Sequence, residues 1–200
     1  MLGRKIKKLK NWLQNRHNLQ LFRFRLAEDR QKTALYRAVL ISHELSATGA
    51  PLMLLAAAEA ILADGGSVRV LAYMDGPLRE KFEKLGISVF YHPGFRDNAR
   101  LLNEFGGDCA YAVANTAGAY PAVSLLKGPR VLWWIHEAQV IEKDYIARFR
   151  QKKFRPDLEQ TLRQAGKLAV VSDYAREIAA KYNPRVEVIH PAVADVAKEQ

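Results

Sequence analysis

The sequence lacks the usual substitutes for a hydrophobic core. It has one cysteine, Cys109, in 200 residues, so no internal disulfide can form. No group of Cys and His residues has the spacing of zinc ligands, so we expect no metal site and no bound cofactor. A chain without disulfides is typical of a reducing compartment, and we expect it to be cytoplasmic.

Long apolar runs and glycine-rich nucleotide loops are also absent. The apolar stretch 51–62 is interrupted by Glu59 and followed by Asp64, so it is too short to span a bilayer. The basic N-terminus lacks the apolar region and cleavage site of a secretory signal peptide. Neither a three-glycine dinucleotide fingerprint nor a Walker loop occurs, which argues against NAD-dependent enzymes and ATP hydrolases.

The positive charge is concentrated at the N-terminus. The chain has 31 Lys and Arg against 21 Asp and Glu, a formal net charge of +10. Residues 1–33 hold ten basic and two acidic side chains, a net charge of +8, whereas the remaining 167 residues hold 21 basic and 19 acidic ones. The basicity therefore belongs to an N-terminal arm, which we place at residues 1–35.

This arm has the pattern of an amphipathic helix. Apolar residues recur at helical spacing at Leu2, Ile6, Leu9 and Leu13. Beside them lie the residues that we expect to bind a membrane: Lys5, Lys7, Lys8, Lys10 and Trp12. Such a helix suits an anionic membrane surface. A partly disordered leader and a helix packed on its own domain stay open as alternatives, and nucleic acid ranks below all three, because no nucleic-acid-binding pattern accompanies the arm.

Short apolar runs alternate with helical patterns over residues 36–195. We expect seven strands, at 38–42, 68–73, 87–91, 109–114, 130–135, 168–171 and 186–189. Helices are expected between them at 49–64, 77–85, 97–105, 119–127, 140–164 and 173–182, with left-handed caps at Gly65 and Gly86. This alternation predicts a single α/β domain, a Rossmann-like doubly wound parallel sheet.

Polar residues follow several of these strands. Ligands of a parallel sheet bind beyond the carboxyl ends of its strands, so we expect one crevice to collect many of these residues. They are His43, Glu44, Ser46, Thr48 and Gly49 after the first strand, Asp75 and Gly76 after the second, Asn115 and Thr116 after the fourth, His136 and Glu137 after the fifth, and Ser172 and Asp173 after the sixth.

Some of these residues have two interpretations. A histidine there can bind a polar ligand or act as an acid or base, or it can satisfy its own loop; we favour ligand binding for His136 and a loop role for His43. Ser46 or Thr48 can cap the helix that follows, where free N–H groups can also attract a phosphate. Ser172 or Asp173 is expected to be a helix N-cap.

Six short motifs, in order, resemble the N-terminal half of a family-four, retaining glycosyltransferase of the GT-B fold. They are ISHELSATGAPL (41–52), DGPL (75–78) with GI (86–87), NT (115–116), WIHE (134–137), VSDY (171–174) and VIHP (188–191). The resemblance implies two Rossmann-like domains with a nucleotide-sugar donor between them. The N-terminal domain would recognise the acceptor, a glycan or a lipid-linked sugar.

By this resemblance, residues 48–50 approach the donor diphosphate and His136 approaches the transferring sugar. The family commonly has two adjacent glycines in this loop, where this chain has Thr48 and Gly49. We therefore expect His136 to be catalytic and the following residues to bind substrate: His43, Ser46, Thr48, Gly49, Asn115, Thr116 and Glu137.

The resemblance also implies that the chain is half of an enzyme. The family's nucleotide-binding domain lies in a C-terminal half, so residues 196–200 would begin a linker to an absent domain or a separate catalytic subunit. On this interpretation the chain alone is catalytically incomplete and works at the inner face of the membrane. The alternative is a non-catalytic module that docks a catalytic subunit or binds a glycan or lipid.

Overall fold

The computed structural model describes residues 2–142 and 157–191. Seven parallel strands form one sheet in the order β3-β2-β1-β4-β5-β6-β7. They are β1 (Arg37–Ser42), β2 (Ser67–Ala72), β3 (Ser88–Tyr91), β4 (Tyr111–Asn115), β5 (Arg130–Ile135), β6 (Lys167–Val170) and β7 (Glu187–Val188). The predicted doubly wound parallel sheet is therefore confirmed, and β5 lies inside it, between β4 and β6.

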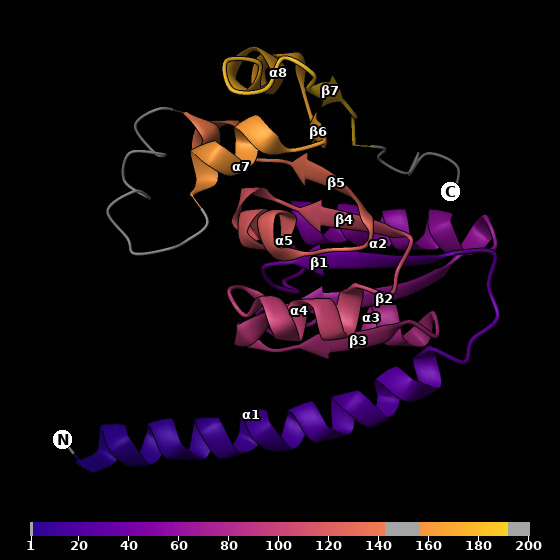
Figure 1. Ribbon diagram of the computed structural model, residues 1–200, viewed down its shortest axis with the longest axis vertical. Helices are drawn as coiled ribbons and strands as arrows, with labels where there is room; N and C mark the ends of the chain where they lie inside the picture. The colour runs from indigo at the N-terminus through magenta and orange to yellow at the C-terminus, as the bar shows by residue number, and fades with distance from the viewer. Residues whose placement is uncertain (1, 143–156, 192–200) are drawn as a thin grey trace, which may run out of the picture.

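Helices cover both faces of the sheet. The α-helices are α1 (Leu2–Asp29), α2 (Gly49–Ala63), α3 (Arg79–Lys84), α4 (Ala99–Gly106), α5 (Tyr120–Leu125), α7 (Leu158–Gln164) and α8 (Asp173–Ala179), and the 3-10 helices are η1 (Pro93–Phe95), η2 (Ala117–Ala119) and η3 (Ala138–Ile141). Helices α2 and α3 pack on one face, and α4, α5 and α7 pack on the other (Figure 1). The helix expected at 140–164 is represented by η3 and α7, and its residues 143–156 lie outside the described residues.

The core follows the alternation of side chains along each strand. In β1, Val39 and Ile41 pack beneath α4, whereas Leu40 packs beneath α2. Trp133 and Trp134 point to opposite faces of β5, and both are buried. Apolar side chains thus fill both faces of the central strands, as the continuous apolar runs in the sequence predict.

Turn residues end the helices as expected. Gly65 and Gly86 have φ values of 80° and 74°, so both expected left-handed caps are confirmed. Gly76 allows a close approach, because a Cβ there would lie 2.3 Å from the Leu45 carbonyl oxygen. Ser172 caps α8, its side chain accepting from the Ala175 N–H at 3.2 Å.

The C-terminal part of α1 belongs to the folded domain. Phe22 and Leu26 are buried, and the Phe22 ring meets the rings of Phe90 and Tyr91 edge-on at 5.5 and 5.3 Å. Ion pairs flank this contact, among them Arg23 with Glu104 and Arg30 with Asp108. Of the interpretations left open for the arm, a helix packed on its own domain describes this part.

No helix within the described ranges is both long enough and apolar enough to cross a membrane.

Candidate functional site

A cavity of about 220 Å³ opens where β1, β4 and β5 end, on the face covered by α5 and α7. Its lining is formed by His43, Thr116, Ala117, Gly118, Tyr120, Glu137, Val140 and Leu158. Three of the predicted substrate-binding residues, His43, Thr116 and Glu137, therefore meet in one place. His43 lines the cavity with a third of its side chain exposed.

A chain of polar contacts leads from this cavity to the start of α2. His43 Nδ1 lies 3.0 Å from Thr116 Oγ1, and His43 Nε2 lies 3.5 Å from Glu44 Oε1. The Ser46 hydroxyl donates to the same Glu44 oxygen at 2.8 Å and lies 2.8 Å from Thr48 Oγ1. Thr48 occupies the N-cap position of α2 but makes no side-chain cap bond, and Ser46 makes none either. The predicted cap is therefore not formed.

Thr116 holds an unusual backbone conformation at the floor of the cavity. Its φ of 74° and ψ of 162° lie in a region that favours glycine over a β-branched residue. Three hydrogen bonds hold its backbone there: its N–H donates to the Trp134 carbonyl at 2.8 Å, and its own carbonyl accepts from Trp133 Nε1 at 2.8 Å and from the Ala119 N–H at 3.3 Å. Glu137 Oε2 accepts from the next N–H, that of Ala117, at 3.2 Å.

His136 points to the opposite side of the sheet from this cavity. Its ring lies 4.6 Å from the ring of Trp134, measured between centroids. Trp133 belongs to the core beneath α5 and α7, and Trp134, the next residue of the strand, faces the other side of the sheet. Burial lowers the pKa of His136 below its ordinary value, although the charge of Glu137 acts the other way, so the ring is mainly neutral at pH 7. The expectation of a single crevice holding His136 with His43 therefore needs correction: the site has two sides.

Three buried polar atoms mark this second side. Asn115 Oδ1, Trp134 Nε1 and His136 Nε2 have no hydrogen-bond partner among the described residues. Asn115 pairs with Trp134 in the β4–β5 register, and its Nδ2 donates to the carbonyl of Ala50 in the first turn of α2 at 2.9 Å. An unsatisfied buried group costs about 1–3 kcal/mol, so such a cluster indicates a place for a polar ligand.

The start of α2 borders this second side and is open to solvent. Gly49 is exposed, and a Cβ at this position would meet nothing within 4 Å. The first N–H groups of a helix have no partner within the helix, and they favour anions. Gly49 therefore leaves the approach to these N–H groups clear.

Other polar residues at the strand ends have structural roles. Asp75 accepts from the Gly76 N–H at 2.9 Å and pairs with Arg79, and Ser172 is a helix cap. Sequence reasoning missed Tyr120 and Leu158, which line the cavity from α5 and α7. No polar pattern in the sequence signals them, because only the packing of these helices brings them to the strand ends.

The predicted membrane-binding residues, Lys5, Lys7, Lys8, Lys10 and Trp12, all fall within α1. Their side chains lie outside the described part of the structure. Within the described residues, no cluster of three or more His, Cys, Asp or Glu side chains has an arrangement that could hold a metal ion.

Residues 36–190 match the sequence model of the family described as Glycosyl-transferase family 4. The fold is similar to that of Anabaena HepE in complex with UDP-glucose (TM-score 0.58, 14% identity, covering 79% of this chain and 44% of that chain). It is also similar to that of an alpha-glucosyltransferase in complex with UDP and a 13-mer DNA containing an HMU base (TM-score 0.53, 14% identity, covering 79% and 43%). No curated protein matches the chain. The chain spans less than half the length of these solved structures.

Proposed function

Because this chain belongs to glycosyl-transferase family 4, we propose that it is the acceptor-binding half of an enzyme that transfers a sugar from a nucleotide-sugar donor to a glycan or a lipid-linked acceptor. The observation that carries this proposal is the two-sided site at the carboxyl ends of β1, β4 and β5. A polar cavity lies on one side, unsatisfied buried polar atoms lie on the other, and a chain of polar contacts joins the cavity to the start of α2.

The acceptor sugar occupies the cavity. At about 220 Å³, the cavity is smaller than the roughly 300 Å³ at which pockets for drug-sized ligands begin, so it suits one sugar unit. His43 and Glu137 offer hydrogen bonds to hydroxyl groups, and Tyr120 and Leu158 offer apolar surface to the faces of the ring. This mixture of polar and apolar lining matches a sugar, which has hydroxyl groups at its edge and apolar C–H groups on the faces of its ring.

The donor lies on the second side, against the start of α2. The N–H groups there and the helix dipole attract the diphosphate. We infer that Asn115 Oδ1, Trp134 Nε1 and His136 Nε2, which have no partner among the described residues, hydrogen-bond the sugar that is transferred. A neutral His136 can hydrogen-bond a hydroxyl group of the transferred sugar near the reacting carbon, which is why we assign it the catalytic role.

Tight donor binding and transfer require a second domain or a separate subunit. The coverage supports this part of the proposal, since the chain matches less than half of the solved glucosyltransferases. The single cysteine, which is free and buried, is consistent with a cytoplasmic location, which is the compartment that we propose.

The three tryptophan indoles offer a direct test by nuclear magnetic resonance. Titration of the isotope-labelled chain with UDP-glucose should shift the Trp134 indole N–H and the amides of Gly49 and Ala50, while the Trp12 indole stays unchanged. UDP alone should shift the two amides but not the Trp134 indole. If neither ligand moves the amides at millimolar concentration, the start of α2 is not the donor site.

Catalysis is tested in the enzyme assembled with its donor-binding half. His136→Ala should lower kcat by about 100-fold or more, in the range of a lost hydrogen bond to the transition state. His190→Ala, which removes an exposed histidine outside the site, should change it less than about 2-fold. Equal activity of the two variants would remove His136 from the site and leave the binding module as the better description.

A further inference from the structure

The C-terminal turns of helix α1, at residues 21–29, have one buried face and one exposed face. Phe22, Leu26 and Asp29 are buried against the domain. On other sides of the same turns, Leu21 is 52% exposed and Phe24 is 69% exposed. An exposed leucine and phenylalanine three positions apart form an apolar strip that no described part of the domain covers.

The apolar stripe of the arm follows this outward side. Helix α1 is continuous from Leu2 to Asp29, so each residue advances about 100° around its axis. The stripe is centred about 160° around the axis from Phe22, Leu26 and Asp29, and about 30° from Phe24; its positions are Leu2, Ile6, Leu9 and Leu13. By position on the helix, the stripe therefore falls on the side of α1 that holds Phe24, opposite the docked face.

The charge of this helix is of one sign. Residues 1–27 contain eight Lys and Arg and no Asp or Glu, since the first acidic residue is Glu28. Among the described side chains, acidic residues of the domain pair with the C-terminal part of the helix, as Arg25 does with Glu83 and Arg30 with Asp108. A surface that complements the charge and the apolar pattern of the N-terminal part would be anionic and would also accept an apolar stripe.

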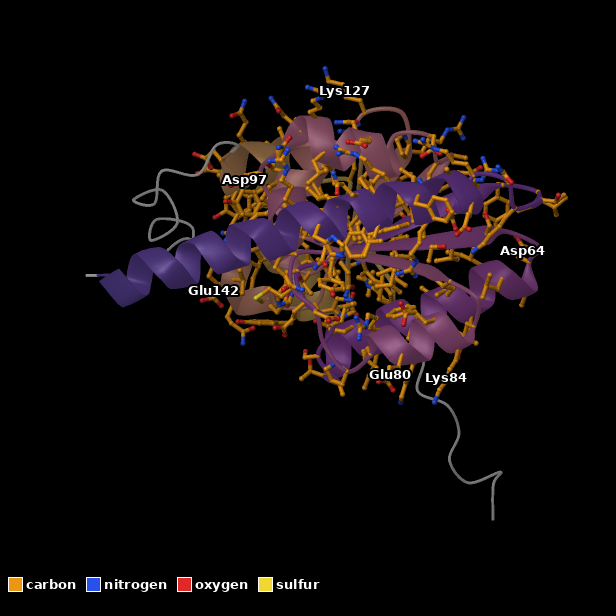
Figure 2. The ribbon with its side chains drawn as sticks, turned by 90° about the horizontal axis from the view of Figure 1, so that it is seen from below. Asp64, Glu80, Lys84, Asp97, Lys127 and Glu142 are labelled. Atoms are coloured by element: carbon orange, nitrogen blue, oxygen red, sulfur yellow. The ribbon has the colours of Figure 1, made fainter. Side chains whose placement is uncertain are left out.

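The direction of α1 relates this helix to the site. Strands β3 to β5 run with their carboxyl ends toward the side on which the N-terminus of α1 lies (Figure 1). Seen from below, α1 extends past the side of the molecule where Asp97 and Glu142 lie, and Asp64 lies at the opposite end (Figure 2). Asp97 and Glu142 follow β3 and β5, so the helix projects beyond the carboxyl edge of the sheet.

We propose that the outward face of α1 is a membrane-binding surface for anionic lipid, and that the docked C-terminal part of the helix holds the carboxyl edge of the sheet close to the bilayer. The apolar stripe inserts at the level of the headgroups, and the flanking cations bind lipid phosphates. The proposal does not depend on sugar transfer, because it rests on the two faces of α1, its charge and its direction.

The test is co-sedimentation of the whole chain with vesicles of phosphatidylcholine alone and with about one-third phosphatidylglycerol. Lys5 and Lys10 lie on the two flanks of the stripe, and reversing both to Glu should weaken binding to the anionic vesicles about 100-fold or more. The matched control reverses two exposed lysines of the domain, Lys81 and Lys84, and should weaken it less than about 3-fold. Both double variants should keep the thermal midpoint of the parent chain.

The apolar stripe has its own variant. As NaCl rises from about 0.1 to 0.5 M, binding of the parent chain to anionic vesicles should weaken, but some binding should remain because of the apolar insertion. The double variant Ile6→Gln with Leu9→Gln should lose this remaining binding. The control Leu35→Gln, at an exposed position of the domain, should keep it. Absence of binding to anionic vesicles, or equal loss in the two lysine variants, would overturn the proposal. So would a lipid-free dimer that Ile6→Gln with Leu9→Gln dissociates, since the outward face would then bind a second copy.

Discussion

Buried polar groups at the two ends of the sheet differ in whether they have hydrogen-bond partners. At the amino end, Arg69 is 1% exposed and donates to Asp29, Asp108 and the Phe105 carbonyl. At the carboxyl end, Asn115, Trp134 and His136 each keep a buried polar atom without a partner among the described residues. Arg69 is thus fully paired at the amino end, where Arg37 Nε is the unpartnered buried atom among the described residues, whereas we propose that the three unpartnered atoms at the carboxyl end bind a ligand. The following experiments test this contrast.

The largest effect is expected at Arg69. Arg69→Met removes the cation between Asp29 and Asp108 and leaves their carboxylates without it, so the free energy of unfolding should fall by about 3–5 kcal/mol in urea titration. Asp29→Asn added to this variant should recover part of the loss, because it removes a buried charge. Arg163→Met, on an exposed pair with Glu159, should cost less than about 1 kcal/mol; an equal loss at the two arginines would end the contrast.

The same cluster predicts a dependence on acid. Burial opposes ionisation of Asp29 and Asp108, but hydrogen bonds and the charge of Arg69 outweigh it and lower the pKa of both. A carboxyl whose folded pKa is lowered stabilises the fold above its unfolded pKa of about 3.9, and that stability is lost as pH falls through the folded value. The urea midpoint should stay nearly level from about pH 7 to 5 and fall below about pH 4. Arg69→Met should show a much shallower fall.

Two glycines after strands at the carboxyl edge of the sheet allow the effect of packing to be measured separately from the effect on binding. Gly76→Ala should destabilise the chain by about 1–3 kcal/mol, because its Cβ would meet the Leu45 carbonyl. Gly49→Ala has open space around it and lies at the first position of α2, so the free energy of unfolding should stay level or rise by up to about 1 kcal/mol. UDP-glucose binding by Gly49→Ala should nevertheless weaken, and undiminished binding would place the diphosphate elsewhere.

The smallest expected effect is a difference in stability between variants of the two adjacent tryptophans. Trp133→Phe loses the bond from Nε1 to the Thr116 carbonyl, whereas Trp134→Phe removes an N–H that has no described partner. Both changes remove the same atoms from the ring, so they should differ mainly by the lost hydrogen bond. Trp133→Phe should therefore lower the free energy of unfolding by about 1–2 kcal/mol more than Trp134→Phe does. Thermal unfolding of the two variants measures it, and a larger loss at Trp134 would show that its N–H is satisfied.

Local patterns predicted most of the fold because each was complete within a short stretch. Seven apolar runs became seven parallel strands, and Gly65 and Gly86 adopted left-handed caps. Polar residues after the strands did gather at the carboxyl edge, since every parallel strand ends there. The cavity residues His43, Thr116 and Glu137 are the clearest example.

The sequence by itself determined the α/β order, the edge of the sheet at which the polar residues of the candidate site gather, and the charge of the arm, because each depends on periodicity or on counting. Only the tertiary structure decided that His136 turns away from His43, because the direction of a side chain after a strand depends on where pairing stops. Only it decided that α1 docks through Asp29 on Arg69, because 40 positions separate these residues along the chain and no local pattern joins them.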